Sequence, residues 1–83
     1  MKMEKYKYGQ WVREVRNGSS LRGQVMAVVE YGDDEPDLRG TWYVIYYLIP
    51  ARNQYSRPEW RRGTARHEWL VPLPARLIPA RLP

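Results

Sequence analysis

Arginine and aromatic residues alternate between positions 52 and 69, in the stretch RNQYSRPEWRRGTARHEW. This stretch holds five arginines against two glutamates, with three aromatic residues interspersed among them. A guanidinium group can bind a phosphate through two parallel hydrogen bonds, and an aromatic ring can stack on a nucleobase. The pattern therefore predicts contact with an anionic partner, and the candidate contact residues are Arg52, Tyr55, Arg57, Trp60, Arg61, Arg62 and Arg66.

The excess of positive over negative charge arises in the second part of the chain. Residues 1–50 carry seven Lys or Arg and seven Asp or Glu, whereas residues 51–83 carry seven Arg and two Glu. The second part thus accounts for the whole formal charge of +5. A basic chain with clustered arginines favours a nucleic acid, DNA or RNA, as the partner.

Two alternatives for the same residues remain open. Trp, Tyr and Arg also contribute most of the energy at protein interfaces, so the partner could be an anionic protein surface and the chain an accessory or inhibitor protein. In the other alternative, the tryptophans pack against the fold and the arginines only face solvent.

Residues suited to catalysis or metal binding are sparse. His67 is the only histidine and cysteine is absent, so the usual ligand sets of zinc sites are not available. Glu68 would point to the opposite side of a strand and would not act with His67 on one substrate atom. We therefore predict a non-enzymatic protein with no catalytic residue, no metal and no cofactor.

Residues 32–40, GDDEPDLRG, carry five charges and a proline, which predicts a loop. Asp33-Asp34-Glu35 lacks the alternating ligand spacing and central glycine of a calcium loop. The sequence favours a solvated acidic loop. In the alternative, its carboxylates mimic phosphates and bind a basic groove of another protein, or they pair with the arginine segment of the same chain.

The apolar pattern predicts a succession of short β-strands. Asn17-Gly18 between two of them is typical of a hairpin turn, and Gly23 is expected to mark a bulge. A long basic loop with one helical turn is expected over residues 51–63. The predicted strands are 10–16, 21–31, 41–49 and 64–71, with a last short strand after a proline-bounded turn.

The strand expected over residues 41–49, TWYVIYYLI, is apolar on both faces. A thin barrel buries only one face of a strand, so the other face should meet a covering loop, a ligand or a second chain. A small chain also gains core by self-association. We predict a homo-oligomer whose interface draws on Trp42, Tyr43, Tyr46 and Tyr47.

Five short strands in 83 residues predict an all-β fold, a small SH3-like barrel. Residues 1–8 should form a loose lead-in, and residues 9–83 a single domain with its acidic loop at 32–40 and its basic loop at 51–63. The tail LVPLPARLIPA resembles the end of such barrels, where a strand leads into a 3₁₀ turn before the last strand. Leu77 would then plug the barrel.

The stretch Gly9-Gln-Trp-Val12-Arg13, followed by Gly18 and by Gly23-Gln24-Val25, resembles the opening of the plasmid-encoded type II dihydrofolate reductases. These are SH3-like barrels that form a tetramer around a pore, so the resemblance implies this fold and an oligomer. Where the family has a Val-Gln-Ile-Tyr run that binds folate and nicotinamide, this chain has Glu68-Trp69-Leu70-Val71, and Glu14 replaces a lysine. Reductase activity is therefore not expected.

No apolar run approaches the ~20 residues that span a bilayer. The first residues, MKMEKYKYG, lack the apolar segment of a signal peptide. We expect a cytoplasmic protein with no membrane contact.

Overall fold

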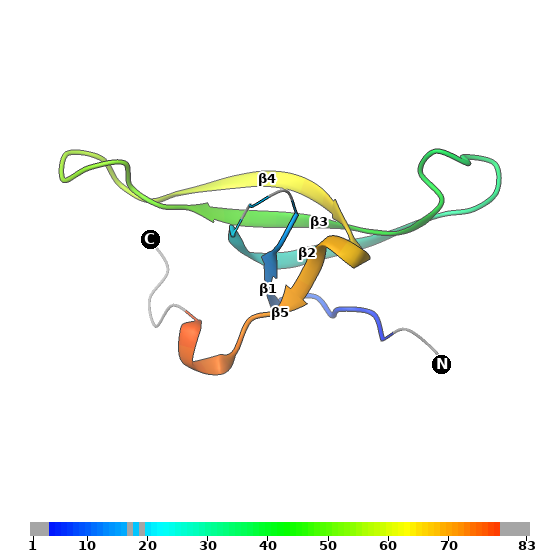
Figure 1. Ribbon diagram of the computed structural model, residues 1–83, viewed down its shortest axis with the longest axis horizontal. Helices are drawn as coiled ribbons and strands as arrows, with labels where there is room; N and C mark the ends of the chain where they lie inside the picture. The colour runs from blue at the N-terminus through cyan, green and yellow to red at the C-terminus, as the bar shows by residue number, and fades with distance from the viewer. Residues whose placement is uncertain (1–3, 17, 19, 79–83) are drawn as a thin grey trace.

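Five antiparallel β-strands form a single sheet in the computed structural model of the protein, which describes residues 4–78 except 17 and 19. The strand order is β4-β3-β2-β1-β5, because the last strand returns to pair with the first (Figure 1). The elements in chain order are β1 (Trp11–Glu14), β2 (Arg22–Tyr31), β3 (Gly40–Ile49), β4 (Glu59–Arg66), the 3₁₀ turn η1 (His67–Trp69), β5 (Leu70–Pro72) and the 3₁₀ turn η2 (Ala75–Leu77).

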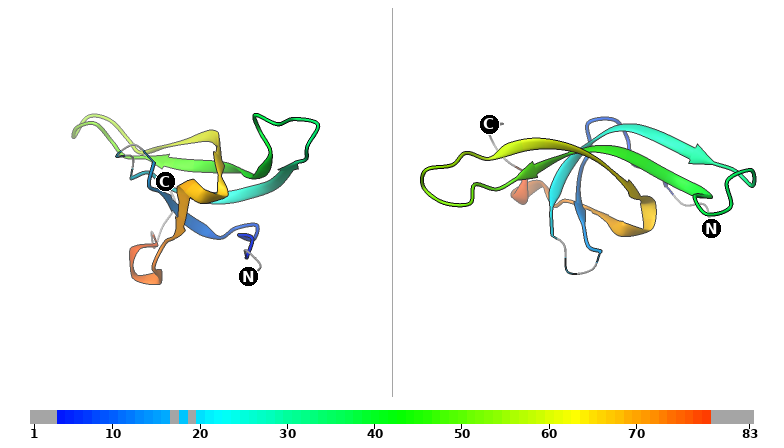
Figure 2. Two further views of the ribbon diagram at one scale, coloured as in Figure 1. Left: turned by 45° about the vertical axis from the view of Figure 1, so that its right-hand side comes forward. Right: turned by 90° about the horizontal axis from the view of Figure 1, so that it is seen from above.

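The predicted all-β architecture of five strands is confirmed, but the sheet is open. Among the described residues, β4 pairs only with β3 and β5 pairs only with β1, so these two strands are the edges of the sheet. The long β2–β3–β4 layer and the shorter β1 and β5 beneath it are seen from two further directions in Figure 2. The continuous ring of hydrogen bonds of a closed barrel is therefore not formed.

β4 begins at Glu59, whereas the sequence predicts a basic loop through residue 63. The β3–β4 hairpin stays in register as far as Ile49 opposite Glu59, which leaves residues 50–58 as the basic loop. An edge strand can carry arginines because their charged groups stay in solvent while the backbone pairs. The helical turn predicted at 58–61 is replaced by the start of this strand.

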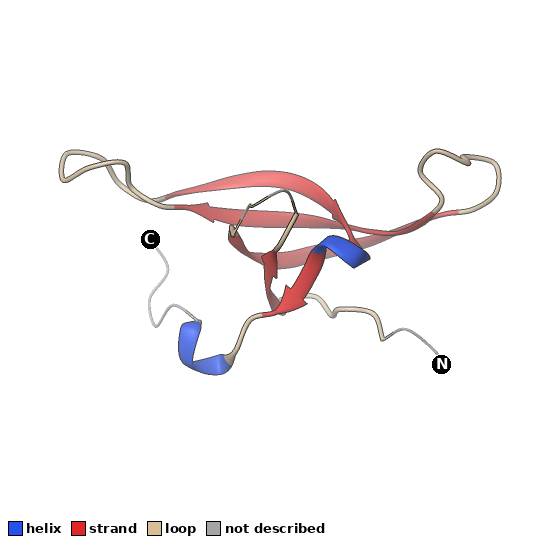
Figure 3. Cartoon of the chain, in the orientation of Figure 1, coloured by secondary structure: helices blue, strands red, loops and turns tan. Residues whose placement is uncertain are grey.

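The strand predicted over residues 64–71 is interrupted. β4 ends at Arg66, η1 makes one 3₁₀ turn, and β5 begins at Leu70 (Figure 3). A 3₁₀ turn before the last strand of the sheet is thus confirmed in η1, and the 3₁₀ turn predicted to end at Leu77 is also present, as η2. Leu77 is 45% exposed, so its predicted role as the plug is wrong, and the buried leucines here are Leu70 and Leu73. Most of the strand predicted beyond Leu77 lies outside the described residues.

The bulge in β2 lies between Val25 and Ala27, where the register with β3 shifts, and not at Gly23 as predicted. Gly23 is required for a different reason. A Cβ atom there would come within 2.6 Å of Ile45 Cγ2 and 2.8 Å of the Tyr46 carbonyl oxygen. The extra residue at the bulge exchanges the two faces of β2 beyond that point.

One face of the sheet is the core, as predicted for the strand at 41–49. Tyr43, Ile45 and Tyr47 alternate along β3 and are buried, while their neighbours are half-buried or exposed. The other core residues on this inner face are Val12, Val25, Ala65 and Leu70. We call the opposite side of β2, β3 and β4 the outer face.

β3 separates two charged loops. The acidic loop, residues 32–39, joins β2 to β3 at one end of the sheet, and the basic loop, residues 50–58, joins β3 to β4 at the other end (Figure 1). The chain measures 47 × 24 × 22 Å, and the loops lie at opposite ends of its long axis. The two loops of one chain therefore do not meet.

Candidate functional site

The side chains of β4 alternate between the two faces of the sheet, and this divides the predicted contact residues. Arg62 lies opposite Tyr46 on the outer face, and Trp60 shares that face. Arg61 lies opposite the buried Tyr47 on the inner face. The two neighbouring arginines therefore belong to different surfaces.

An aromatic and basic patch lies on the outer face, toward the basic loop. Tyr46 is 41% exposed, Arg62 beside it is exposed, and Trp60 is half-buried. The rings of Tyr46 and Trp60, together with two side chains of β2, line a shallow hollow of about 300 Å³. We call the following five residues the outer patch: Gln24, Met26, Tyr46, Trp60 and Arg62.

The outer patch is supported by the first strand of the sheet. Trp60 packs against the buried Trp11, with ring centroids 5.8 Å apart and planes tilted by 45°. Gln24 donates from Nε2 to the carbonyl oxygen of Gly9 at 2.9 Å. These contacts restrict the side chains before any partner binds, which reduces the entropy lost on binding.

The sequence does not predict Gln24 and Met26 of the outer patch as contact residues, and it predicts Tyr46 at an oligomer interface. Gln24 and Met26 belong to β2, and Tyr46 belongs to β3. The pairing of β2 with β3 and of β3 with β4 brings these residues next to Trp60 and Arg62. The one feature of the local sequence that could have indicated this patch is the alternation along β3, which places Tyr46 on the side opposite the core.

The basic loop folds around Ser56 and Asn53. Ser56 Oγ accepts from the backbone N–H of Arg52 at 2.8 Å and from that of Asn53 at 3.1 Å. Asn53 Oδ1 accepts from the N–H of Tyr55 at 2.8 Å, a turn geometry typical of asparagine. The loop places Tyr55 in solvent with 87% of its surface exposed.

A second hollow, of about 300 Å³, lies at the base of the basic loop, and we call it the loop hollow. Arg52, Arg57 and Arg61 line it. The Arg61 guanidinium donates to Glu59 at 2.7 Å. Within the described residues, no acidic side chain forms an ion pair with Arg52 or Arg57.

Arg66 is engaged at the opposite end of the sheet. Its Nη1 donates to the carbonyl oxygen of Arg39 at 2.9 Å, and its Nη2 donates to that of Asp37 at 2.7 Å. The guanidinium also lies 4.6 Å from the ring centroid of Trp42. Arg66 therefore anchors the acidic loop to β4 and stands apart from the other predicted contact residues.

The four residues predicted at an oligomer interface fall on both faces of the sheet. Tyr43 and Tyr47 are 0% and 7% exposed, so their assignment to a surface is corrected: they are core residues. Tyr46 belongs to the outer patch. Trp42 lies farther along the outer face, where its ring packs edge-on against Tyr31 at 6.4 Å.

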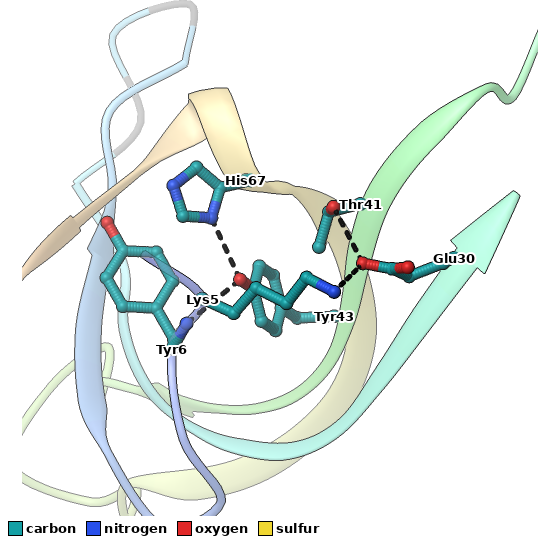
Figure 4. A network of polar contacts seen from close by, with 6 residues as sticks. All are labelled: Lys5, Tyr6, Glu30, Thr41, Tyr43 and His67. Carbon is teal, nitrogen blue, oxygen red and sulfur yellow. Dashed lines mark hydrogen bonds and ion pairs between the residues drawn. The ribbon is translucent and has the colours of Figure 1, made fainter. Parts of the chain in front are cut away.

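The N-terminal segment is tied to the sheet through Tyr6 (Figure 4). The Tyr43 hydroxyl accepts from the Tyr6 N–H at 3.0 Å and is hydrogen-bonded to His67 Nδ1 at 2.8 Å. The Tyr6 ring stacks on His67 with centroids 4.8 Å apart, and its hydroxyl donates to the carbonyl oxygen of Leu70 at 3.0 Å. Burial raises the pKa of both tyrosines. His67 thus helps to hold this segment in place.

A salt bridge continues the same network toward β2 (Figure 4). Lys5 pairs with Glu30, which also accepts from Thr41 Oγ1 at 3.3 Å. The hydrogen bond from Lys5 lowers the pKa of the Glu30 carboxyl group.

Comparisons with protein-family models, with curated proteins and with solved structures find no match to this chain. In residues 4–78, gaps excepted, no group of three or more acidic or histidine side chains could hold a metal ion. The same part of the chain has no helix that is long and apolar enough to cross a membrane.

Proposed function

We propose that this protein is a non-enzymatic module that binds single-stranded nucleic acid, DNA or RNA, across the outer patch. The observation that carries the proposal is the cross-strand pair of Tyr46 and Arg62 beside Trp60. An exposed ring offers a stacking surface to a base, and the neighbouring guanidinium offers paired donors to a phosphate. Because neither contact reads the edge of a base, binding is expected to be independent of sequence.

Single strands suit the outer patch better than duplexes. In a duplex the faces of the bases are covered by their neighbours, so the rings of Tyr46 and Trp60 can stack only on unpaired bases. Tyr55 in the basic loop provides a further ring, which is 87% exposed.

We also infer that the open sheet is a variant of the SH3-like architecture. The succession of antiparallel strands, with a 3₁₀ turn before the strand that pairs with β1, supports this assignment. An architecture of this kind serves many functions, so the proposed activity depends on the outer patch and not on the fold.

The test is fluorescence anisotropy of a labelled oligothymidylate titrated with the protein between about 50 and about 200 mM salt. We expect binding that weakens as salt rises, with a logarithmic slope of about −0.7 for each contacted phosphate of a single strand. A duplex of the same length should bind less tightly. Millimolar or weaker affinity at the lowest salt would overturn the proposal.

A protein partner is the second candidate, because the outer face continues into an apolar surface. Val29, Tyr31, Leu38 and Trp42 line a hollow of about 210 Å³ beyond the outer patch. Such a surface suits an apolar side chain of another protein or of a second copy of this chain. Binding to one protein that persists at high salt would favour this candidate. A mass by light scattering that rises with concentration would identify a homo-oligomer.

A further inference from the structure

The loop hollow brings three arginines together. Arg52, Arg57 and Arg61 line it with Ser56, and Glu59 is the one acidic residue of the lining. Three arginines and one glutamate leave a formal charge of +2 in a space of about 300 Å³. This concentration of charge lies on the other side of β4 from Arg62.

We propose that the loop hollow binds the terminal phosphate of the single-stranded nucleic acid that the outer patch binds, an inference that rests on the proposed function. A terminal phosphate is a monoester with a charge of about −1.5 to −2 at neutral pH. An internal phosphodiester carries a single negative charge. The charge of the hollow therefore matches the monoester more closely. The guanidinium groups would hold its three terminal oxygens through charge-assisted hydrogen bonds.

The hydrogen bonds of the basic loop prepare this site. The Ser56 hydroxyl accepts from two backbone donors and itself donates to the carbonyl oxygen of Asn53 at 3.2 Å, which closes the turn that carries Arg52 and Arg57. Within the described part of the chain, neither of these arginines forms an ion pair that a phosphate would have to displace. Arg61 pairs with Glu59 in solvent, and an exposed pair of this kind is weak.

The edge position of β4 allows one strand of nucleic acid to reach both sites. Among the described residues, no further strand pairs with β4 on the side away from β3. Trp60 and Arg62 lie on the outer face and Arg61, between them, lies on the inner face. The outer patch and the loop hollow therefore lie on opposite faces of the same edge strand and share β4 as a common border. A nucleic acid that turns around this edge places its bases on the patch and its terminal phosphate in the hollow.

The first experiment compares oligothymidylates that differ only in their ends. One ends in hydroxyl groups, one carries a 5′-phosphate and one carries a 3′-phosphate, and their affinities are measured by anisotropy at one salt concentration. We expect one of the phosphorylated strands to bind about tenfold more tightly than the unphosphorylated strand. Equal affinities of all three would overturn this inference and leave the proposed function standing.

Four variants separate the hollow from general charge effects. Arg57→Ala removes an arginine of the hollow and should abolish most of the preference for the phosphorylated strand. Arg62→Ala should weaken binding of all three strands and keep the preference. Glu59→Gln raises the charge of the hollow and should increase the preference. Arg39→Ala, which removes the same charge at the far end of the molecule, should leave the preference unchanged. If Arg39→Ala lowers it as much as Arg57→Ala does, the inference is wrong.

The hollow can also be tested without an oligonucleotide, which distinguishes its failure from that of the proposed function. Thymidine 5′-monophosphate and thymidine 3′-monophosphate are titrated separately into isotope-labelled protein and followed by amide NMR. The amide signals of Arg52, Ser56 and Arg57 should shift with at least one of these monophosphates and not with thymidine. Absence of these shifts would overturn the inference whether or not oligonucleotides bind. A phosphoserine peptide that binds as tightly as the phosphorylated strand would overturn the assignment to nucleic acid.

Discussion

Tyr46 and Arg62 are direct cross-strand partners on the outer face. Tyr46 belongs to β3, which lies between β2 and β4, and Arg62 belongs to the edge strand β4. Side chains in this relation have Cβ atoms about 4.5–5.5 Å apart. A ring and a guanidinium at that separation can contact the base and the phosphate of one nucleotide. The pairing of β3 with β4 fixes the spacing of these two groups, whereas Tyr55 depends on the conformation of the basic loop.

Substitutions at this pair should weaken nucleic-acid binding in two different ways. Tyr46→Ala removes a stacking surface and should cost about 1–3 kcal/mol of binding free energy. Arg62→Ala removes a phosphate contact and should lower the steepness of the salt dependence by about 0.7. Anisotropy of an oligonucleotide over a range of salt concentrations measures both effects.

The matched control for the Arg62 variant is Arg39→Ala. Arg39 pairs with Asp33 in the acidic loop, at the other end of the molecule. Its removal lowers the net charge by the same amount and should leave the salt dependence nearly unchanged. If both variants lower the slope equally, net charge and not the outer patch accounts for binding.

The parts of the fold that depend on local sequence could be predicted. The Asn17-Gly18 signal correctly pairs the first two strands, with Gly18 at a φ of 78°, while Asn17 lies outside the described residues. Alternation over residues 41–49 correctly gives a strand with one buried face. The sequence predicts a loop at 59–63 because the charge of this arginine-rich run hides the strand pattern, and only the pairing with β3 defines the strand.

The arrangement of the candidate site could not be predicted, because it depends on the register in which β4 pairs with β3. In a loop, Arg61 and Arg62 would share one surface, whereas in a strand they point to opposite faces. The bulge after Val25 similarly decides which residues of β2 reach the outer face. A shift of one residue reverses these assignments, and the spacing of the arginines in the sequence contains no information about it.

Gly23→Ala should destabilise the fold. The added methyl group would come too close to the Ile45 side chain and to the backbone of Tyr46, and overpacking of this kind costs about 1–3 kcal/mol. At Gly32 a Cβ atom would have no neighbour within 4 Å, so Gly32→Ala should change the free energy of unfolding by less than about 0.5 kcal/mol. Urea denaturation of the two variants provides the comparison. Equal stability would show that β2 and β3 are not so closely packed at Gly23.

Tyr47 should make the fold less stable in alkaline solution. Its hydroxyl donates to Glu14 at 3.2 Å, and burial, with a smaller effect of the Glu14 carboxylate, raises its pKa above the ordinary value of 10.0. As the pH rises past that value, the unfolded chain releases the proton while the folded chain retains it, so the free energy of unfolding falls. Tyr6 and Tyr43 also have raised pKa values and act in the same direction.

Urea denaturation from about pH 8 to above the ordinary tyrosine pKa of about 10 measures this effect. Tyr47→Phe should reduce the alkaline loss of stability without abolishing it, because two other tyrosines contribute. At neutral pH the variant should be less stable by about 0.5–1.5 kcal/mol, the usual net contribution of one hydrogen bond. An alkaline decline as steep as that of the unchanged protein would contradict the assignment to Tyr47.

Tyr43→Phe should weaken the attachment of the N-terminal segment to the sheet, although the hydrogen bond from Tyr6 to Leu70 and the Lys5–Glu30 salt bridge remain. The substitution removes the acceptor of the Tyr6 N–H and the partner of His67 Nδ1, which should cost about 1–3 kcal/mol. Hydrogen exchange of the Tyr6 amide should become faster. Tyr8→Phe is the control, since Tyr8 is exposed and should leave this exchange rate unchanged. Persistent protection of the Tyr6 amide in the Tyr43 variant would show that another group accepts its hydrogen bond.

Arg66 should prove to be a stabilising residue and not a contact for nucleic acid. Its guanidinium donates to the carbonyl oxygens of Asp37 and Arg39 and lies over Trp42, so Arg66→Ala should lower the free energy of unfolding by about 1–3 kcal/mol. Arg66→Lys keeps the charge but cannot reproduce the planar pair of donors, and it should recover little of that loss. Because Arg66 lies far from the outer patch, both variants should keep the salt dependence of binding that Arg62→Ala reduces. Full stability of Arg66→Lys would show that charge alone matters at this position, and a lowered salt slope would return Arg66 to the contact surface that the sequence predicts.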